Sequence, residues 1–161
     1  MNAGPLNLSD ADMKGFDPLE PGRYNAEVVE ITMDAVKNEG KTPIGTPIVK
    51  FQFKITDEEY ANRRVWTQFV VPPKDYDESK AAKMKGMLAR TFISLGTPEE
   101  EVLAKNFDPD FEDYKGVPCV VTVGKEPKKD RQGNIVEGEY NNPVKSVKPA
   151  GSEVASSGSV L

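Results

Sequence analysis

The sequence contains no histidine and only one cysteine, and it has no apolar run long enough to span a bilayer. Histidine is the usual proton shuttle and the commonest metal ligand, so its absence argues against both uses. With Cys119 alone, no disulfide can form within the chain, which is typical of a reducing compartment. No signal-peptide pattern opens the chain. We therefore expect a cytoplasmic protein with no membrane contact, no metal and no cofactor.

Enzyme motifs are missing as well. The chain shows no nucleophile with a nearby base and no glycine loop that would cradle phosphates, so an enzyme is the least expected class. The formal net charge of −5 also excludes a general attraction to nucleic acid. Any contact with phosphates must therefore come from a local basic patch.

The length of 161 residues predicts one domain with loose ends. We expect an N-terminal arm over residues 1–20, a folded domain over residues 21–149, and a disordered tail over residues 150–161. The tail is rich in glycine, serine, alanine and valine, which cannot bury enough apolar surface to fold.

Apolar and polar side chains alternate along two adjacent stretches, residues 48–56 and 63–71. Alternation with a period of two predicts strands, because successive side chains of a strand point to opposite faces. The phenylalanine and valine positions predict one buried face. The opposite face, which we call the outer face, then carries Lys50, Gln52, Lys54, Arg64, Trp66 and Gln68.

This outer face combines cations for phosphates with a flat ring for bases, which is what a platform for single-stranded nucleic acid needs. Arg63 is a further candidate for phosphate contact. Each side chain also has a simpler interpretation, since strand cations often serve only solubility and tryptophan in a small barrel is often core. The parity that Trp66 shares with Arg64 and Gln68 favours its exposure.

Further strands and a helix surround these two stretches. Residues 22–36 predict a long first strand, and its apolar positions switch parity after Val28, which predicts a β-bulge. Residues 77–95 predict a helix with an apolar stripe. Two more strands are expected at residues 116–125 and 139–148. The hairpin loop between them carries four candidate phosphate ligands, which alternatively are only solvated charges: Lys125, Lys128, Lys129 and Arg131.

Three strands, a helical segment and two strands are the element order of a five-stranded OB barrel. The expected fold class is therefore mainly β, a five-stranded OB-like barrel with a helical segment between the third and fourth strands. Such barrels bind oligonucleotides on the second and third strands, between the first and fourth connecting loops. In this chain those elements are the outer face, the loop at residues 37–47 and the basic hairpin, so all candidate patches converge on one side.

Five short stretches of the domain carry a family resemblance: Gly22-Arg23-Tyr24-Asn25-Ala26, Tyr60-Ala61-Asn62-Arg63-Arg64-Val65, Leu88 to Gly96, Tyr114-Lys115-Gly116-Val117, and Tyr140-Asn141-Asn142-Pro143-Val144-Lys145. They resemble small phage-encoded single-stranded DNA-binding proteins of replication and recombination. The resemblance implies sequence-independent binding of single-stranded DNA in the host cytoplasm. It leaves open two further kinds of partner, a second copy of the chain and phage or host replication and recombination proteins.

Two features of the sequence depart from that family. Asn62 stands where glycine is expected, although asparagine also tolerates a positive φ. After Lys148 the only charged residue is Glu153, so the tail lacks the acidic tip through which bacterial single-strand binders recruit partners. Recruitment through the tail is therefore not expected.

Two alternatives to DNA binding stay open. The chain could be a structural or assembly protein of a phage particle, built on a small β domain. It could also inhibit or recruit a host factor through residues 107–114, where aromatic and acidic side chains alternate. The simpler interpretation of that segment is a solvated loop with anchored aromatic rings.

Overall fold

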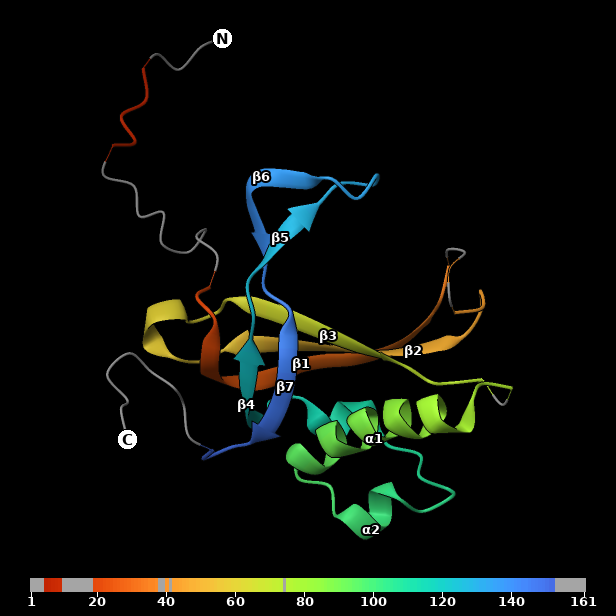
Figure 1. Cartoon of the computed structure of the whole chain (residues 1–161). Coiled ribbons are helices and arrows are strands. Elements are labelled where there is room, and N and C mark those ends of the chain that lie inside the picture. Colours follow the sequence, from red (N-terminus) through yellow and green to blue (C-terminus); the bar gives the residue numbers. More distant parts are fainter. Residues whose placement is uncertain (1–4, 10–18, 38–39, 41, 74, 153–161) are drawn as a thin grey trace.

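A computed structural model describes residues 5–9, 19–37, 40, 42–73 and 75–152. Most of the expected arm (residues 1–20) and of the expected tail (residues 150–161) lies outside these described residues. The described part contains a five-stranded antiparallel sheet, a main helix and a separate two-stranded hairpin (Figure 1). None of its helices is both long and apolar enough to cross a membrane.

The five strands of the sheet lie in the order β3-β2-β1-β4-β7. Their bounds are β1 Gly22–Ala35, β2 Pro47–Ile55, β3 Arg64–Val70, β4 Pro118–Val123 and β7 Val144–Pro149. The hairpin consists of β5 Glu126–Lys129 and β6 Ile135–Asn141. The helices are α1 Glu78–Ser94 and α2 Glu99–Val102, with short 3-10 turns η2 Glu58–Tyr60 and η3 Phe111–Tyr114. The predicted main helix between the third and fourth strands is confirmed.

β1 is long enough to pair with two neighbours. Its first half pairs with β4 and most of its length pairs with β2. The register with β2 shifts between Val28 and Glu30, which confirms the predicted bulge. An extra residue bends a strand, so β1 turns away from β4 after the bulge and continues along β2. Asn62 has a φ of 71°, as its place in the turn before β3 requires.

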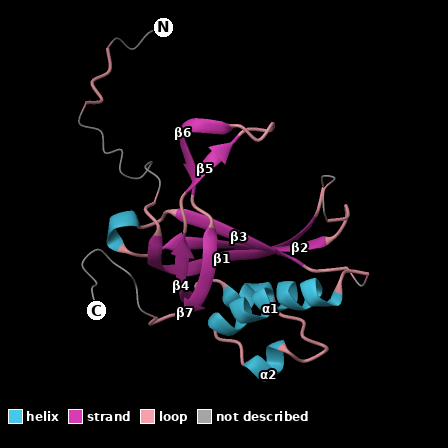
Figure 2. Cartoon of the chain, viewed as in Figure 1, coloured by secondary structure: helices cyan, strands magenta, loops and turns pink. Residues whose placement is uncertain are grey.

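Helix α1 lies against one face of the sheet (Figure 2), and the core is packed between this inner face and the helix. Phe51 and Phe53 of β2 are fully buried, and Val65 of β3 is 2% exposed. The ring of Phe51 packs edge-on against Phe92 of α1, with centroids 5.5 Å apart. The parity predicted for the two central strands is therefore confirmed.

The expected closed barrel is wrong. The edge strands β3 and β7 have Cα atoms within 8 Å of one another, but no backbone ladder joins them in the described residues. Side chains of α1 stand at the opening, where a cavity of about 440 Å³ is lined by β3, α1 and β7. The hydroxyl of Ser94 in α1 also donates to the Val147 carbonyl of β7, at 2.9 Å. We call this opening the β3–β7 seam.

The last predicted strand is divided in two. β6 ends at Asn141 and β7 begins at Val144, and Pro143 between them has no N–H to continue a ladder. The Asn142 side chain joins this break to two other segments. Its Oδ1 accepts from the Leu19 N–H at 2.9 Å, and its Nδ2 donates to the carbonyls of Leu19 at 2.8 Å and Gly124 at 2.9 Å. Leu19 itself is only 1% exposed and belongs to the core.

Replacing Asn142 with alanine should lower the free energy of unfolding by about 2–4 kcal/mol, because three hydrogen bonds of roughly 1 kcal/mol each are lost. Urea denaturation measures the change. The matched control is Asn141→Ala, which removes an exposed amide one residue away. Equal denaturation midpoints for the two variants would contradict the anchoring role of Asn142.

Candidate nucleic-acid interface

The outer face consists of three cross-strand pairs between β2 and β3. Lys50 lies opposite Gln68, Gln52 opposite Trp66, and Lys54 opposite Arg64. Along each strand these residues alternate with residues whose side chains point into the core. Side chains of directly opposite residues on one face are close enough to touch. The structure thus brings together all six residues predicted for this face.

Trp66 is the exposed aromatic side chain at the centre of this face. Its exposed fraction is 58%, and no ring contact to it occurs within the described part of the chain. Gln52 lies across from it, with a lysine and an arginine one pair further along. An indole in this position is open to stacking with a planar ligand.

The two lysines of the outer face are held by carboxylates from β1. Lys50 contacts Asp34 at 2.9 Å, and Lys54 contacts Glu27 at 2.9 Å. The hydrogen bond from Lys50, together with one from the Ala35 N–H, lowers the pKa of Asp34 to about 2. The carboxylates of β1 therefore neutralise part of the charge that the face offers to phosphates.

Sequence reasoning missed this acidic row, which consists of Glu27, Glu30 and Asp34. Glu30 pairs with Gln52 in the strand register and is exposed. The signal was present in the sequence, since acidic residues occupy the polar positions of the first strand on both sides of its parity switch. Only the strand pairing, however, shows that they lie beside the lysines.

The two arginines at the start of β3 differ in placement. Arg64 is exposed on the outer face, opposite Lys54. Arg63 precedes the strand, is half-buried and shares parity with the buried Val65. Its Nη1 atom is buried and has no hydrogen-bond partner among the described residues. Arg63 is therefore not brought together with the outer face.

The predicted basic loop is the β5–β6 hairpin and its base. Lys125 contacts Glu20 at 3.3 Å, and its Nζ lies 4.8 Å from the centre of the Tyr140 ring. Lys128 lies 3.8 Å from Glu139. Lys129 and Arg131 are exposed, and neither forms an ion pair within the described ranges. The hairpin thus presents two free cations near its tip.

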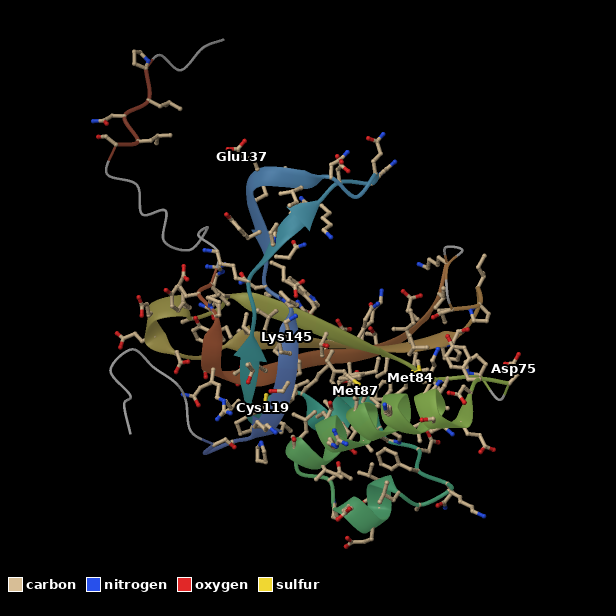
Figure 3. All side chains as sticks on the ribbon, in the orientation of Figure 1. Asp75, Met84, Met87, Cys119, Glu137 and Lys145 are labelled. Carbon is tan, nitrogen blue, oxygen red and sulfur yellow. The ribbon has the colours of Figure 1, made fainter. Side chains whose placement is uncertain are left out.

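The hairpin and the β1–β2 loop project to the side of the sheet that faces away from α1 (Figure 1). Figure 3 shows the same separation in labelled residues, with Glu137 on the hairpin and Met84 and Met87 on α1 at opposite sides of the sheet. Residues 38, 39 and 41 of the β1–β2 loop lie outside the described residues. The outer face therefore lies between two projecting segments.

Nothing in the described part of the chain points to redox or metal chemistry. Cys119 is 2% exposed, and its burial raises the pKa of the thiol to about 12. A thiol of this kind is protonated and inert at neutral pH. No group of three or more cysteine, aspartate or glutamate side chains is arranged to hold a metal ion in the described ranges.

The acidic aromatic segment at residues 107–114 is anchored to the core. The rings of Phe107 and Tyr114 contact Phe92 edge-on, with centroids 5.4 and 5.3 Å away, and Phe111 stacks on it at 6.5 Å. The acidic side chains between these rings are exposed. This placement agrees with a solvated loop held by its aromatic rings.

A comparison with curated proteins finds no match. The sequence profile of one protein family, described as "Protein of unknown function (DUF669)", matches residues 6–157. That description names no activity, but the match covers most of the chain, including every strand and helix given above. The chain therefore belongs to the DUF669 family.

Proposed function

We propose that this protein binds single-stranded DNA without sequence preference and performs no chemistry, in support of phage DNA replication or recombination. The observation that carries the proposal is Trp66, which is 58% exposed between amide and cationic side chains on the outer face. Single-strand binders use this combination because every base has a face that can stack and every nucleotide has a phosphate.

The strand order supports an OB-like interpretation of the sheet. β1, β2 and β3 are followed by a helix and then by β4 and β7, which is the OB order with a hairpin inserted before the last strand. We interpret the sheet as an OB-like barrel that is open between β3 and β7. In such folds the second and third strands bind oligonucleotides between the first and fourth connecting loops, and here those loops flank the outer face.

The ion pairs of Lys50 and Lys54 are compatible with this proposal. Both lysines are partly exposed, with exposed side-chain fractions of 43% and 31%. Exposed ion pairs contribute little to stability and are screened by salt, so a phosphate can replace the carboxylate at either lysine. Phosphate contacts of this kind make the affinity fall as salt concentration rises.

Fluorescence anisotropy with a labelled oligo-dT at low salt tests the proposal. We expect binding whose log affinity falls with log salt at a slope of about −0.7 for each phosphate neutralised. A duplex of the same length is the control, because its paired bases cannot stack on Trp66. Absence of oligo-dT binding at about 100 µM protein, the weak end of non-specific affinities, would end the proposal.

Removing the carboxylates that hold the two lysines should strengthen DNA binding. We expect the double variant Glu27→Gln/Asp34→Asn to bind oligo-dT roughly threefold to tenfold more tightly at low salt, because two further cations become free for phosphates. The control is Glu99→Gln/Glu100→Gln on α2, which changes the charge equally at exposed side chains away from the outer face. If both double variants change the affinity alike, only net charge matters and the β1 pairs have no local role.

A further inference from the structure

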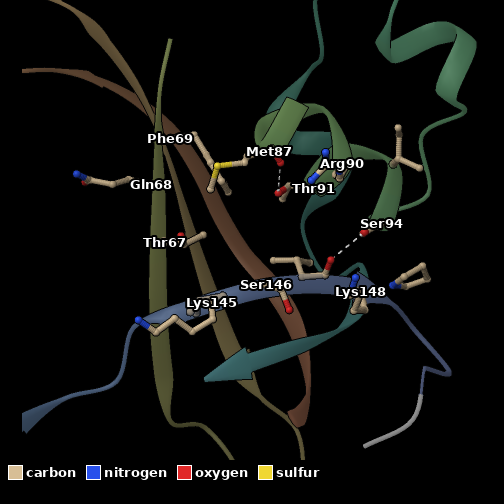
Figure 4. A pocket seen from close by; sticks show the side chains of 14 residues that line it. Thr67, Gln68, Phe69, Met87, Arg90, Thr91, Ser94, Lys145, Ser146 and Lys148 are labelled. Carbon is tan, nitrogen blue, oxygen red and sulfur yellow. Dashed lines mark hydrogen bonds between the residues drawn. The ribbon is translucent and has the colours of Figure 1, made fainter. Parts of the chain in front are cut away.

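The β3–β7 seam contains a cavity that shares only Gln68 with the outer face. Its volume is about 440 Å³, and side chains from β3, α1 and β7 surround it (Figure 4). Binding sites for small molecules have volumes of roughly 300–1,000 Å³. The seam is thus large enough to receive one nucleotide-sized group.

The charge at the seam is of one sign. Arg90, Lys145 and Lys148 line the cavity, and no carboxylate does. Lys145 contacts Glu126, whereas Arg90 and Lys148 form no ion pair within the described part of the chain. These two exposed cations differ from Lys50 and Lys54, which carboxylates hold. The seam therefore attracts anions.

Part of the wall of the same cavity is apolar, and the rest is formed by hydroxyl, amide and cationic side chains. Phe69 of β3, Met87 of α1 and Val144 of β7 contribute to the apolar part, and Met87 is 53% exposed. The neighbouring hydroxyls of α1 are already engaged, because Thr91 donates to the Met87 carbonyl and Ser94 donates to the Val147 carbonyl, each at 2.9 Å. A ligand would therefore meet apolar atoms on the wall and cations at the rim.

An apolar surface beside free cations matches the chemistry of a nucleoside phosphate. We propose that the seam binds one nucleoside phosphate unit, with its base against Met87 and Phe69 and its phosphate on Arg90 and Lys148. Gln68 connects this site to the outer face, because it lines the cavity and lies opposite Lys50 in the strand register. The occupant is then one nucleotide of a bound DNA strand, so the seam site rests on the proposed function.

The ε-methyl groups of methionine report on the seam directly. Protein labelled with ¹³C at these methyls is titrated with oligo-dT and, separately, with thymidine 5′-monophosphate at low salt, and Met87→Leu assigns the Met87 signal. We expect a saturable change in the chemical shift of the Met87 methyl signal. The signal of Met33, which lines a different cavity, should not change. A shift with oligo-dT identifies a unit of a strand as the ligand, and a shift with the monophosphate alone identifies a free nucleotide.

The double variant Arg90→Gln/Lys148→Gln tests whether these two cations bind the phosphate. We expect the Met87 titration to weaken by at least about tenfold, because hydrogen bonds to charged groups are lost. The salt slope for oligo-dT should also become shallower by about 0.7, the value for the one phosphate that the two cations share. The control Lys80→Gln/Lys105→Gln carries the same charge change on exposed residues outside the seam and should leave the Met87 titration unchanged.

Two results would overturn the seam site. The first is a Met87 signal that moves with neither ligand, and the second is a titration that the Arg90→Gln/Lys148→Gln variant leaves as it was. Anisotropy of the same samples separates the two proposals. Oligo-dT that binds without moving Met87 removes the seam site and leaves the outer face as the DNA-binding surface.

Discussion

Replacing Trp66 with alanine is expected to weaken oligo-dT binding by roughly 5-fold to 150-fold, because stacking contributes about 1–3 kcal/mol per base. The indole is 58% exposed and lies opposite Gln52 at the centre of the outer face. Its loss removes stacking as well as contact area, so the effect should exceed that of any single lysine change on the face. Fluorescence anisotropy at low salt measures both.

The folded state should tolerate this change. Exposed side chains away from special features usually alter stability by less than about 0.5 kcal/mol, so the urea midpoint of Trp66→Ala should stay close to that of the parent. Leu103→Ala serves as a control, because Leu103 is 64% exposed at the end of α2, which lies on the α1 side of the sheet. Equal oligo-dT affinities for these two variants would show that the indole is not the binding platform.

Unlike Trp66→Ala, Phe51→Ala should cause a large loss of stability. We expect the free energy of unfolding to fall by about 3–5 kcal/mol, the usual range for a core phenylalanine. Phe51 is fully buried, and its ring lies 6.1 Å from Phe53, 5.6 Å from Phe69 and 5.5 Å from Phe92 between ring centroids. Its removal leaves a cavity where the sheet meets α1. Urea denaturation followed by circular dichroism measures the loss.

Phe51→Leu separates the cavity from the loss of the ring contacts. Leucine refills part of the volume, so its loss of stability should be well below that of alanine. A cost under about 1 kcal/mol for Phe51→Ala would be too small for a core position of this kind. It would mean that Phe51 does not pack between the sheet and α1.

The sequence predicted the strand faces well, because side-chain parity is a local property. Alternation along β2 and β3 correctly separated Phe51, Phe53 and Val65 from Trp66. The parity switch after Val28 correctly located the bulge of β1. Both signals lie within a few residues of the feature that they predict.

The features that sequence reasoning missed depend on contacts between distant segments. Asp34 meets Lys50 and Glu27 meets Lys54 because of the register in which β1 pairs with β2 on either side of the bulge. The hydrogen bonds of Asn142 to Leu19 join residues 123 positions apart. The closed barrel was wrong for the same reason, since side chains of α1 line the opening between β3 and β7 and Ser94 donates to the Val147 carbonyl.

The absence of a ladder between β3 and β7 has a mechanical consequence. A fully closed barrel has a fixed circumference, because widening it breaks backbone hydrogen bonds. Here β3 and β7 can move apart without breaking backbone hydrogen bonds between strands, because they share none in the described residues. The width of the opening, and with it the curvature of the sheet, is therefore set by α1 through its core packing and the Ser94–Val147 hydrogen bond instead of by strand pairing.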